Sequence, residues 1–102
     1  MARTRHPTPL SNQHLEQIAA LFKVLGEPMR LRILQTVCKQ PLCVGDIVRA
    51  AGSTQANVSK HLSLMGTAGV LHRERNGQRV FYSVREPLVL KLCETVRAHW
   101  IS

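Results

Sequence analysis

Residues 53–62 of the chain read Ser-Thr-Gln-Ala-Asn-Val-Ser-Lys-His-Leu, and this stretch predicts an amphipathic helix. Thr54, or Ser53 beside it, has the short oxygen-bearing side chain of a helix N-cap. Beyond the cap, Val58, Leu62 and Met65 recur at the i, i+4, i+7 spacing of one buried stripe. The rest of this helix surface is therefore free to face outward.

The face opposite that stripe carries small and polar side chains. A helix that enters the major groove of DNA needs such a face, because bulky groups would hold it away and short donors and acceptors can reach base edges or phosphates. A polar face is also what any helix presents to water. The residues that we predict to contact DNA from this helix are Thr54, Gln55, Ala56, Asn57, Ser59, Lys60 and Ser63.

A second short helix precedes this one. Its apolar residues, Val44, Ile47, Val48 and Ala51, follow helical spacing, and Gly52 ends it. Two short helices that meet at a Gly-Ser-Thr turn form a helix-turn-helix pattern, which we place at about residues 43–67.

A β-hairpin is predicted next. The segment 75–78, Arg-Asn-Gly-Gln, suits a two-residue type I′ turn, because Asn and Gly both tolerate a positive φ. This register makes a cross-strand ion pair of Glu74 and Arg79. The other predicted pairs are Arg73 with Val80 and His72 with Phe81. The fold class is therefore mainly α with a small β-hairpin, a winged helix-turn-helix.

Three arginines, Arg73, Arg75 and Arg79, cluster near the tip of this predicted wing. Guanidinium groups in that position reach phosphates or the minor groove, so we predict that they contact DNA. Ordinary surface charge is the alternative explanation for them.

The charge balance agrees with a nucleic-acid partner. The chain has 102 residues, with 14 Lys and Arg against 6 Asp and Glu, a net charge of +8. Such an excess favours a polyanionic partner, either nucleic acid or an anionic membrane surface. The charge is spread over several segments rather than lining one helix opposite bulky apolar residues, so no membrane association is predicted.

The sequence also bears on where in the cell the protein works. No apolar run approaches the length of a membrane span, and the N-terminus lacks an apolar signal core. The three cysteines include no CxxC pair and do not resemble a secreted disulfide framework. A cytoplasmic protein is expected.

One domain, residues 11–102, is expected to follow a mobile basic arm at residues 1–10. Three further helices are predicted within this domain, at about residues 12–25, 28–39 and 87–100. In the second of these, Leu31, Leu34 and Cys38 form the predicted buried stripe, broadened by Ile33 and Val37. The first and last helices carry more apolar surface than so small a core needs, which predicts a homodimer through these two helices.

The chain resembles the ArsR/SmtB family of bacterial winged-helix repressors over nearly its whole length past residue 12. The matching segments are 25–34 (LGEPMRLRIL), 42–47 (LCVGDI), 55–62 (QANVSKHL) and 77–82 (GQRVFY). The resemblance implies a homodimer built on the first and last helices. It also implies binding to an inverted repeat in promoter DNA, with release when an inducer is sensed.

The inducer chemistry departs from the patterns of the family. Cys43 matches the first cysteine of the metalloid-sensing members, but Gly45 replaces the second. In the zinc-binding pattern of the last helix, Glu86 and His99 match, whereas Leu88 and Ser102 stand at the other ligand positions, so no closed metal site is predicted.

Thiols are the remaining candidate sensors. Cys43 precedes a predicted helix, where backbone amides and the helix dipole favour thiolate. Cys38 lies five residues earlier, and Cys93 lies on the last helix. We predict that Cys43 and Cys38 are the main sensor thiols and Cys93 the third, for an oxidant, reactive sulfur or a metalloid such as arsenite. Each cysteine also suits the role of a small buried hydrophobe.

Catalysis is not predicted. Ser59 and His61 are two residues apart on one helix and do not face each other, and the chain has no Gly-rich phosphate loop or paired-carboxylate motif. A buried or capping role is expected for His61. The alternatives to a thiol-sensing repressor are a repressor that senses a metal ion and a winged-helix module that binds another protein without specific DNA binding.

Overall fold

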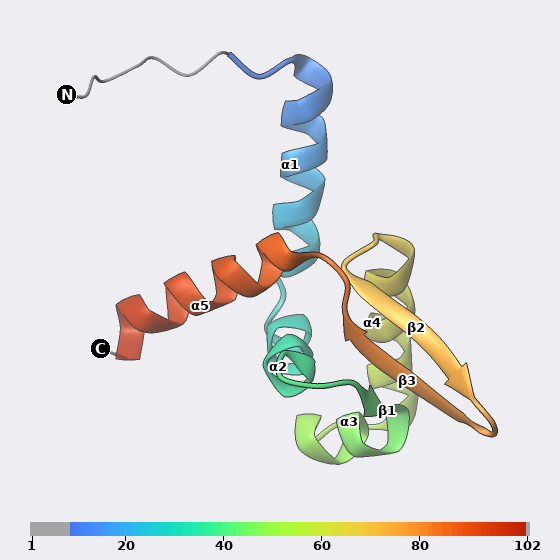
Figure 1. Cartoon of the computed structure of the whole chain (residues 1–102). Helices are drawn as coiled ribbons and strands as arrows, with labels where there is room; N and C mark the ends of the chain where they lie inside the picture. Colours follow the sequence, from blue (N-terminus) through green and yellow to red (C-terminus); the bar gives the residue numbers. More distant parts are fainter. Residues whose placement is uncertain (1–8, 102) are drawn as a thin grey trace.

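The computed structural model describes residues 9–101 and contains five helices and a three-stranded sheet within that range (Figure 1). The bounds are α1 (Asn12–Leu25), α2 (Pro28–Val37), β1 (Leu42–Cys43), α3 (Val44–Ala51), α4 (Gln55–Thr67), β2 (Leu71–Asn76), β3 (Arg79–Val84) and α5 (Pro87–Ile101). The predicted winged helix-turn-helix is confirmed. Most of the arm predicted at residues 1–10 lies outside the described residues.

The helix ends follow the capping chemistry of the sequence. The Ser11 side chain accepts a hydrogen bond from the backbone N–H of His14 and caps α1, and Pro28 occupies the first turn of α2. Helix α2 ends two residues before the predicted limit at Lys39. Gly52, at a φ of 68°, closes α3 in the left-handed conformation that glycine adopts without strain.

The stripe predicted for α2 is only partly correct. Leu34 is buried, but Leu31 is 46% exposed and Cys38 is exposed, whereas Ile33 and Val37 are fully buried. The buried face is therefore centred between Ile33 and Leu34, because α3 and α4 cover that side of the helix. The two residues predicted only to broaden the stripe are part of its centre.

The sheet differs from the prediction in two respects. A short strand, β1, which the sequence did not predict, pairs with β3 and gives the order β1-β3-β2. The turn lies one residue later than predicted, which moves each pairing partner by two residues, so Asn76 pairs with Arg79, Arg75 with Val80 and Glu74 with Phe81. The predicted ion pair of Glu74 with Arg79 was therefore wrong. The two pairs predicted beside it are also replaced, by Arg73 with Tyr82 and His72 with Ser83.

Turn geometry explains this shift. The turn residues are Gly77 and Gln78, and Gly77 has a φ of 68° while no non-glycine residue between 9 and 101 has a positive φ. A glycine at the first turn position is the signature of a type II′ turn. The predicted type I′ turn would have required a positive φ at Asn76 as well, and the observed register avoids that strain.

A single core joins α2, α3, α4 and the sheet. Its fully buried side chains include Ile33, Leu34, Ile47, Val58, Leu62, Met65 and Leu71. The predicted stripe of α4, Val58, Leu62 and Met65, is thus confirmed as its buried face. From α5 only Val89 is fully buried in this core.

Helices α1 and α5 extend away from this core in different directions (Figure 1). Only Leu25 of α1 is buried, and Phe22 is 56% and Trp100 77% exposed. The other exposed large apolar residues of these two helices are Leu15, Ile18, Leu88, Leu90, Val96 and Ile101. Among residues 9–101, no helix has the length and apolar character needed to cross a membrane.

Candidate nucleic-acid interface

A polar groove lies between the helix-turn-helix and the wing. Its volume is about 650 Å³, and it is open to solvent along one side. Its polar lining comes from α3, α4 and the hairpin: Asp46, Arg49, Gln55, Ser59, Ser63, Arg73, Gln78 and Arg79. Three guanidinium groups against one carboxylate give the groove a positive balance, which attracts phosphate.

Helix α4 forms one wall of this groove, and its start is held by Thr54. The Thr54 hydroxyl accepts a hydrogen bond from the backbone N–H of Asn57 at 3.1 Å, as the N-cap pattern predicted. Along the helix, Gln55, Lys60 and Ser63 are exposed. Ala56 is exposed as well, and Ser59 is half-buried at the groove wall.

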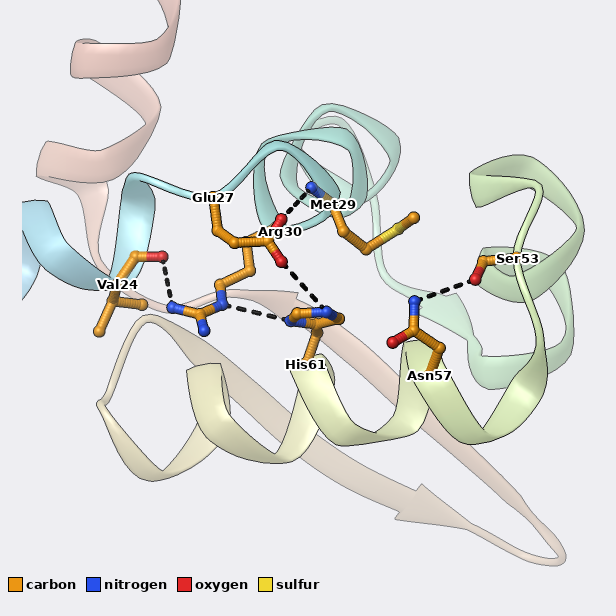
Figure 2. Close-up of polar contacts among 7 residues, drawn as sticks. All are labelled: Val24, Glu27, Met29, Arg30, Ser53, Asn57 and His61. Atoms are coloured by element: carbon orange, nitrogen blue, oxygen red, sulfur yellow. Dashed lines mark hydrogen bonds and ion pairs between the residues drawn. The ribbon is translucent and has the colours of Figure 1, made fainter.

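Asn57 is oriented differently from the other predicted contacts on α4. Its side-chain amide donates to the Ser53 hydroxyl at 3.0 Å, across the turn of the helix-turn-helix (Figure 2). The residue is half-buried. Asn57 therefore ties the first turn of α4 to the turn before it, and its amide N–H is engaged within the protein.

The wing arginines are not equivalent. Arg73 on β2 and Arg79 on β3 line the groove, whereas Arg75 is exposed on the wing and is not part of the lining. A second, smaller groove of about 420 Å³ lies where α4 and the base of the hairpin meet, and it is lined by Thr67, Arg73 and Arg85 among others. Arg73 thus borders both grooves. Arg85 was not among the predicted contacts.

A cysteine, an aspartate and an arginine are linked at the start of α3. The Cys43 thiol donates a hydrogen bond to Oδ2 of Asp46 at 3.2 Å, and Arg49 forms an ion pair with the same carboxylate. The hydrogen bond from Cys43 and the positive charge of Arg49 hold the pKa of Asp46 below its usual value. Cys43 is the N-cap residue of α3 and serves here as a donor to an acidic neighbour.

The three cysteines are free thiols in different surroundings. Cys38 is exposed at the end of α2 and donates to the carbonyl of Gln35, so neither Cys38 nor Cys43 is hydrogen-bonded to the other. Cys93 is half-buried on α5, and burial raises the pKa of its thiol. The Cys38 thiol, which lies near enough to interact through its charge, raises the pKa of Cys93 further.

A cluster that the sequence did not predict lies on the opposite side of α4. His61 is only 5% exposed, which confirms the buried role expected for it. Its ring lies between Arg30, whose Nε is 3.2 Å from Nδ1, and Glu27, whose Oε2 is 3.3 Å from Nε2 (Figure 2). The spacing of these residues in the chain carries no local signal of their contact.

Metal-binding side chains do not gather anywhere in the part of the chain that the structure describes. No group of three or more His, Cys, Asp or Glu residues between 9 and 101 is arranged to hold an ion.

Known proteins share this sequence pattern. Residues 27–73 match the family described as bacterial regulatory protein, arsR family. The chain is 30% identical over 97 residues to a transcriptional repressor SmtB homolog of Synechocystis, covering 95% of this chain and 74% of the relative. It is 32% identical over 97 residues to the HTH-type transcriptional regulator NmtR of Mycobacterium tuberculosis, covering 95% and 81%.

A solved structure has the same fold. It is the homodimeric winged helix-turn-helix DNA-binding domain of a possible ArsR-family transcriptional regulator from Mycobacterium bovis, with a TM-score of 0.77 and 26% identity. The superposition covers 87% of this chain and 85% of that one. The fold, the basic groove and these relatives lead to one assignment. The chain belongs to the ArsR family of bacterial regulatory proteins, winged helix-turn-helix proteins that bind DNA and regulate transcription.

Proposed function

We propose that two copies of this chain bind the two half-sites of an inverted repeat in promoter DNA and repress transcription in the cytoplasm until thiol chemistry releases them. The observation that carries the DNA contact is the groove between α3, α4 and the wing. Its three arginines and its short polar side chains suit a phosphate backbone and base edges respectively.

The two walls of the groove have different tasks in this proposal. The exposed face of α4 enters the major groove, where Gln55, Ser59, Lys60 and Ser63 read base edges. The wing arginines Arg73, Arg75 and Arg79 bind phosphates or the minor groove and so add affinity with little dependence on sequence. Thr54 and Ala56 lie at the start of the same face. Asn57 supports DNA binding indirectly, because its hydrogen bond to Ser53 holds the turn before α4.

The second copy covers the apolar surfaces of α1 and α5. Exposed residues such as Phe22 and Trp100 would otherwise remain in water, and so many exposed large apolar residues on two helices favour an interface. In a two-fold dimer, each copy presents one α4 to the same side of the DNA. The operator is then an inverted repeat with half-sites about one helical turn, or a multiple of it, apart.

Binding to two DNA targets over a series of salt concentrations tests this proposal. One duplex carries the promoter of the protein's own gene, and the other is random in sequence. We expect the promoter duplex to bind at least 1,000-fold more tightly, with affinity for both falling steeply as salt rises. Equal affinity for the two duplexes would exclude sequence-specific recognition, and the absence of a salt dependence would exclude phosphate contacts.

The same proposal assigns thiol sensing to Cys38 and Cys93. Cys38 is exposed and meets an oxidant first, and its charge raises the pKa of the half-buried Cys93 thiol. This replaces Cys43 as the principal sensor, because the thiol of Cys43 is hydrogen-bonded to Asp46.

The chemistry needs no group beyond the inducer. Peroxide oxidises the Cys38 thiol to a sulfenic acid and releases water, and the Cys93 thiol then displaces a second water to form a disulfide. Such a bond requires the two Cα atoms to lie within about 7 Å. Because α5 also belongs to the dimer surface, a bond from α2 to α5 changes the dimer geometry and weakens DNA binding.

Titration of promoter binding with peroxide, persulfide and arsenite tests the sensor assignment. We expect at least one reagent to release the wild-type protein, and Cys38→Ser and Cys93→Ser each to block that release. The Cys43→Ser variant serves as the matched control and should respond like the wild type. Release that persists without Cys38 and disappears without Cys43 would reverse the assignment.

A further inference from the structure

The side chain of Arg30 connects three helices (Figure 2). Its Nη1 donates to the backbone carbonyl of Val24, in the last turn of α1, at 3.1 Å. Its Nε donates to Nδ1 of His61, in the middle of α4, at 3.2 Å. One guanidinium on α2 therefore links the end of α1 to the recognition helix.

Glu27 holds the same histidine from the other side. Its Oε1 accepts the backbone N–H of Met29 at 2.6 Å and caps α2, and its Oε2 lies 3.3 Å from Nε2 of His61. A guanidinium can only donate, so Nδ1 of His61 is the acceptor and Nε2 carries the proton toward Glu27. Both ring nitrogens are engaged, and the orientation of the buried ring is set by two partners on α2.

This connection lies where α1 has few other restraints. Within α1 only Leu25 is buried, and the helix extends away from the core (Figure 1). Few apolar contacts therefore fix its direction relative to α4. The planar guanidinium group of Arg30 can donate to both acceptors, the carbonyl of Val24 and Nδ1 of His61, in a fixed geometry.

In a dimer that uses α1 as an interface, the direction of α1 relative to α4 determines how far apart the two copies of α4 lie. It also determines how they are rotated about the DNA axis. A change of one base pair between half-sites moves them by about 3.4 Å and turns them by roughly 35°. Whether the dimer accepts a change of one base pair therefore depends on how firmly α1 and α4 are connected.

We propose that Arg30, acting through His61 and the carbonyl of Val24, is a positioning residue that sets the half-site spacing the dimer accepts. The inference rests on the proposed binding of a homodimer to an inverted repeat. Glu27 supports it by holding the His61 ring in the orientation that accepts from Arg30.

The Arg30→Lys variant tests this role without a change of charge. An ammonium group lacks the planar fork and cannot reproduce both hydrogen bonds in the same geometry. Arg32→Lys is the matched control, because Arg32 is an exposed arginine on the same helix and its side chain takes no part in the cluster. Thermal melting establishes that each variant is folded.

The assay uses duplexes selected from a random pool by the wild-type protein, together with derivatives whose half-site spacing is one or two base pairs longer or shorter. We expect the wild type and Arg32→Lys to prefer the selected spacing strongly. In Arg30→Lys that preference should fall by roughly tenfold, the factor that accompanies the loss of about one charged hydrogen bond. Affinity for a single half-site should stay within twofold.

A second variant keeps the test decisive if Arg30→Lys does not fold. His61→Gln retains a donor toward Glu27 but lacks the acceptor at Nδ1, so it should relax the spacing preference in the same way. Where both single variants fold, the double variant should be no more relaxed than either, because both substitutions remove one connection.

The outcomes distinguish the proposed dimer on an inverted repeat from the proposed role of Arg30. A wild type that binds all spacings equally would overturn the proposed dimer on an inverted repeat. A wild type that discriminates, together with variants that discriminate just as well, would overturn the role of Arg30 alone. Additive effects in the double variant would also contradict it, since they would show that the two residues act separately.

Discussion

Removal of the N-cap of the recognition helix, Thr54→Ala, should weaken both the fold and DNA binding. The Thr54 hydroxyl accepts the N–H of Asn57 at 3.1 Å, and alanine leaves that donor without its partner. Loss of a Ser, Thr, Asn or Asp cap usually costs about 1 kcal/mol. For a domain of this size, that corresponds to a melting temperature lowered by roughly 4–8 °C.

The effect on DNA binding should exceed what stability alone explains. The first turn of α4 holds Gln55 and Ala56, two of the proposed contacts, and a frayed turn must reorder before it can bind. Ser11→Ala is the matched control, because the Ser11 hydroxyl caps α1 by accepting the N–H of His14 at 3.2 Å, away from the groove. We expect both variants to melt earlier, but Thr54→Ala to lose more promoter affinity than Ser11→Ala at a temperature where both are folded, because the Ser11 cap acts on α1, in the proposed dimer interface, and not on the groove.

Thermal melting and promoter binding of Thr54→Ala, Thr54→Ser and Ser11→Ala make up the assay. Thr54→Ser keeps the capping oxygen and should behave like the wild type. A Thr54→Ala protein that melts with the wild type would refute the capping role. Equal losses of affinity in Thr54→Ala and Ser11→Ala would refute the link between the cap and DNA contact.

Three further predictions concern the wing and the start of α3. Gly77→Ala places a side chain at a φ of 68°, so it should destabilise the protein by about 1–2 kcal/mol, measured by chemical denaturation; an unchanged midpoint would contradict the turn assignment. Arg73→Ala and Arg79→Ala should each make the plot of log affinity against log salt less steep by about 0.9, to a similar extent for promoter and random DNA. A loss of affinity confined to the promoter would instead indicate base contacts. The lowered pKa of Asp46 stabilises the fold above the usual carboxyl range, and this contribution is lost as pH falls through the lowered pKa. Asp46→Asn should therefore lose less stability than the wild type between neutral pH and about pH 3, and an equal loss would show that the contribution is negligible.

Local sequence signals predicted the parts of the fold that depend on local chemistry. The Thr54 cap and the glycine after α3 were predicted, and the helices predicted at residues 12–25, 28–39 and 87–100 end within two residues of the observed ends. The apolar spacing of α4 identified its buried face. Each of these features is decided by residues within about one or two helical turns.

Features that depend on tertiary contacts were missed or misplaced. The segment around Asn76 and Gly77 allows two turn registers, and only the packing of the whole hairpin together with the cost of a positive φ at Asn76 selects one. Arg30 and His61 are 31 residues apart, so their contact has no periodic signature.

The roles of the sensor thiols stay a prediction. The structure shows that the Cys43 thiol donates to Asp46 and that the charge of Cys38 raises the pKa of Cys93. The influence of Cys38 on Cys93 joins residues far apart in the chain, so the sequence carries no local signal of it.

The most direct test of the central claim, that the exposed face of α4 reads the operator, is the affinity of the double variant Ser59→Ala and Lys60→Ala for promoter and random DNA at one salt concentration. Each good base contact is worth about 1–3 kcal/mol of discrimination. The preference for the promoter should therefore fall by at least tenfold, beyond the loss that the missing lysine charge causes on random DNA. An unchanged affinity for the promoter would show that this face does not enter the major groove.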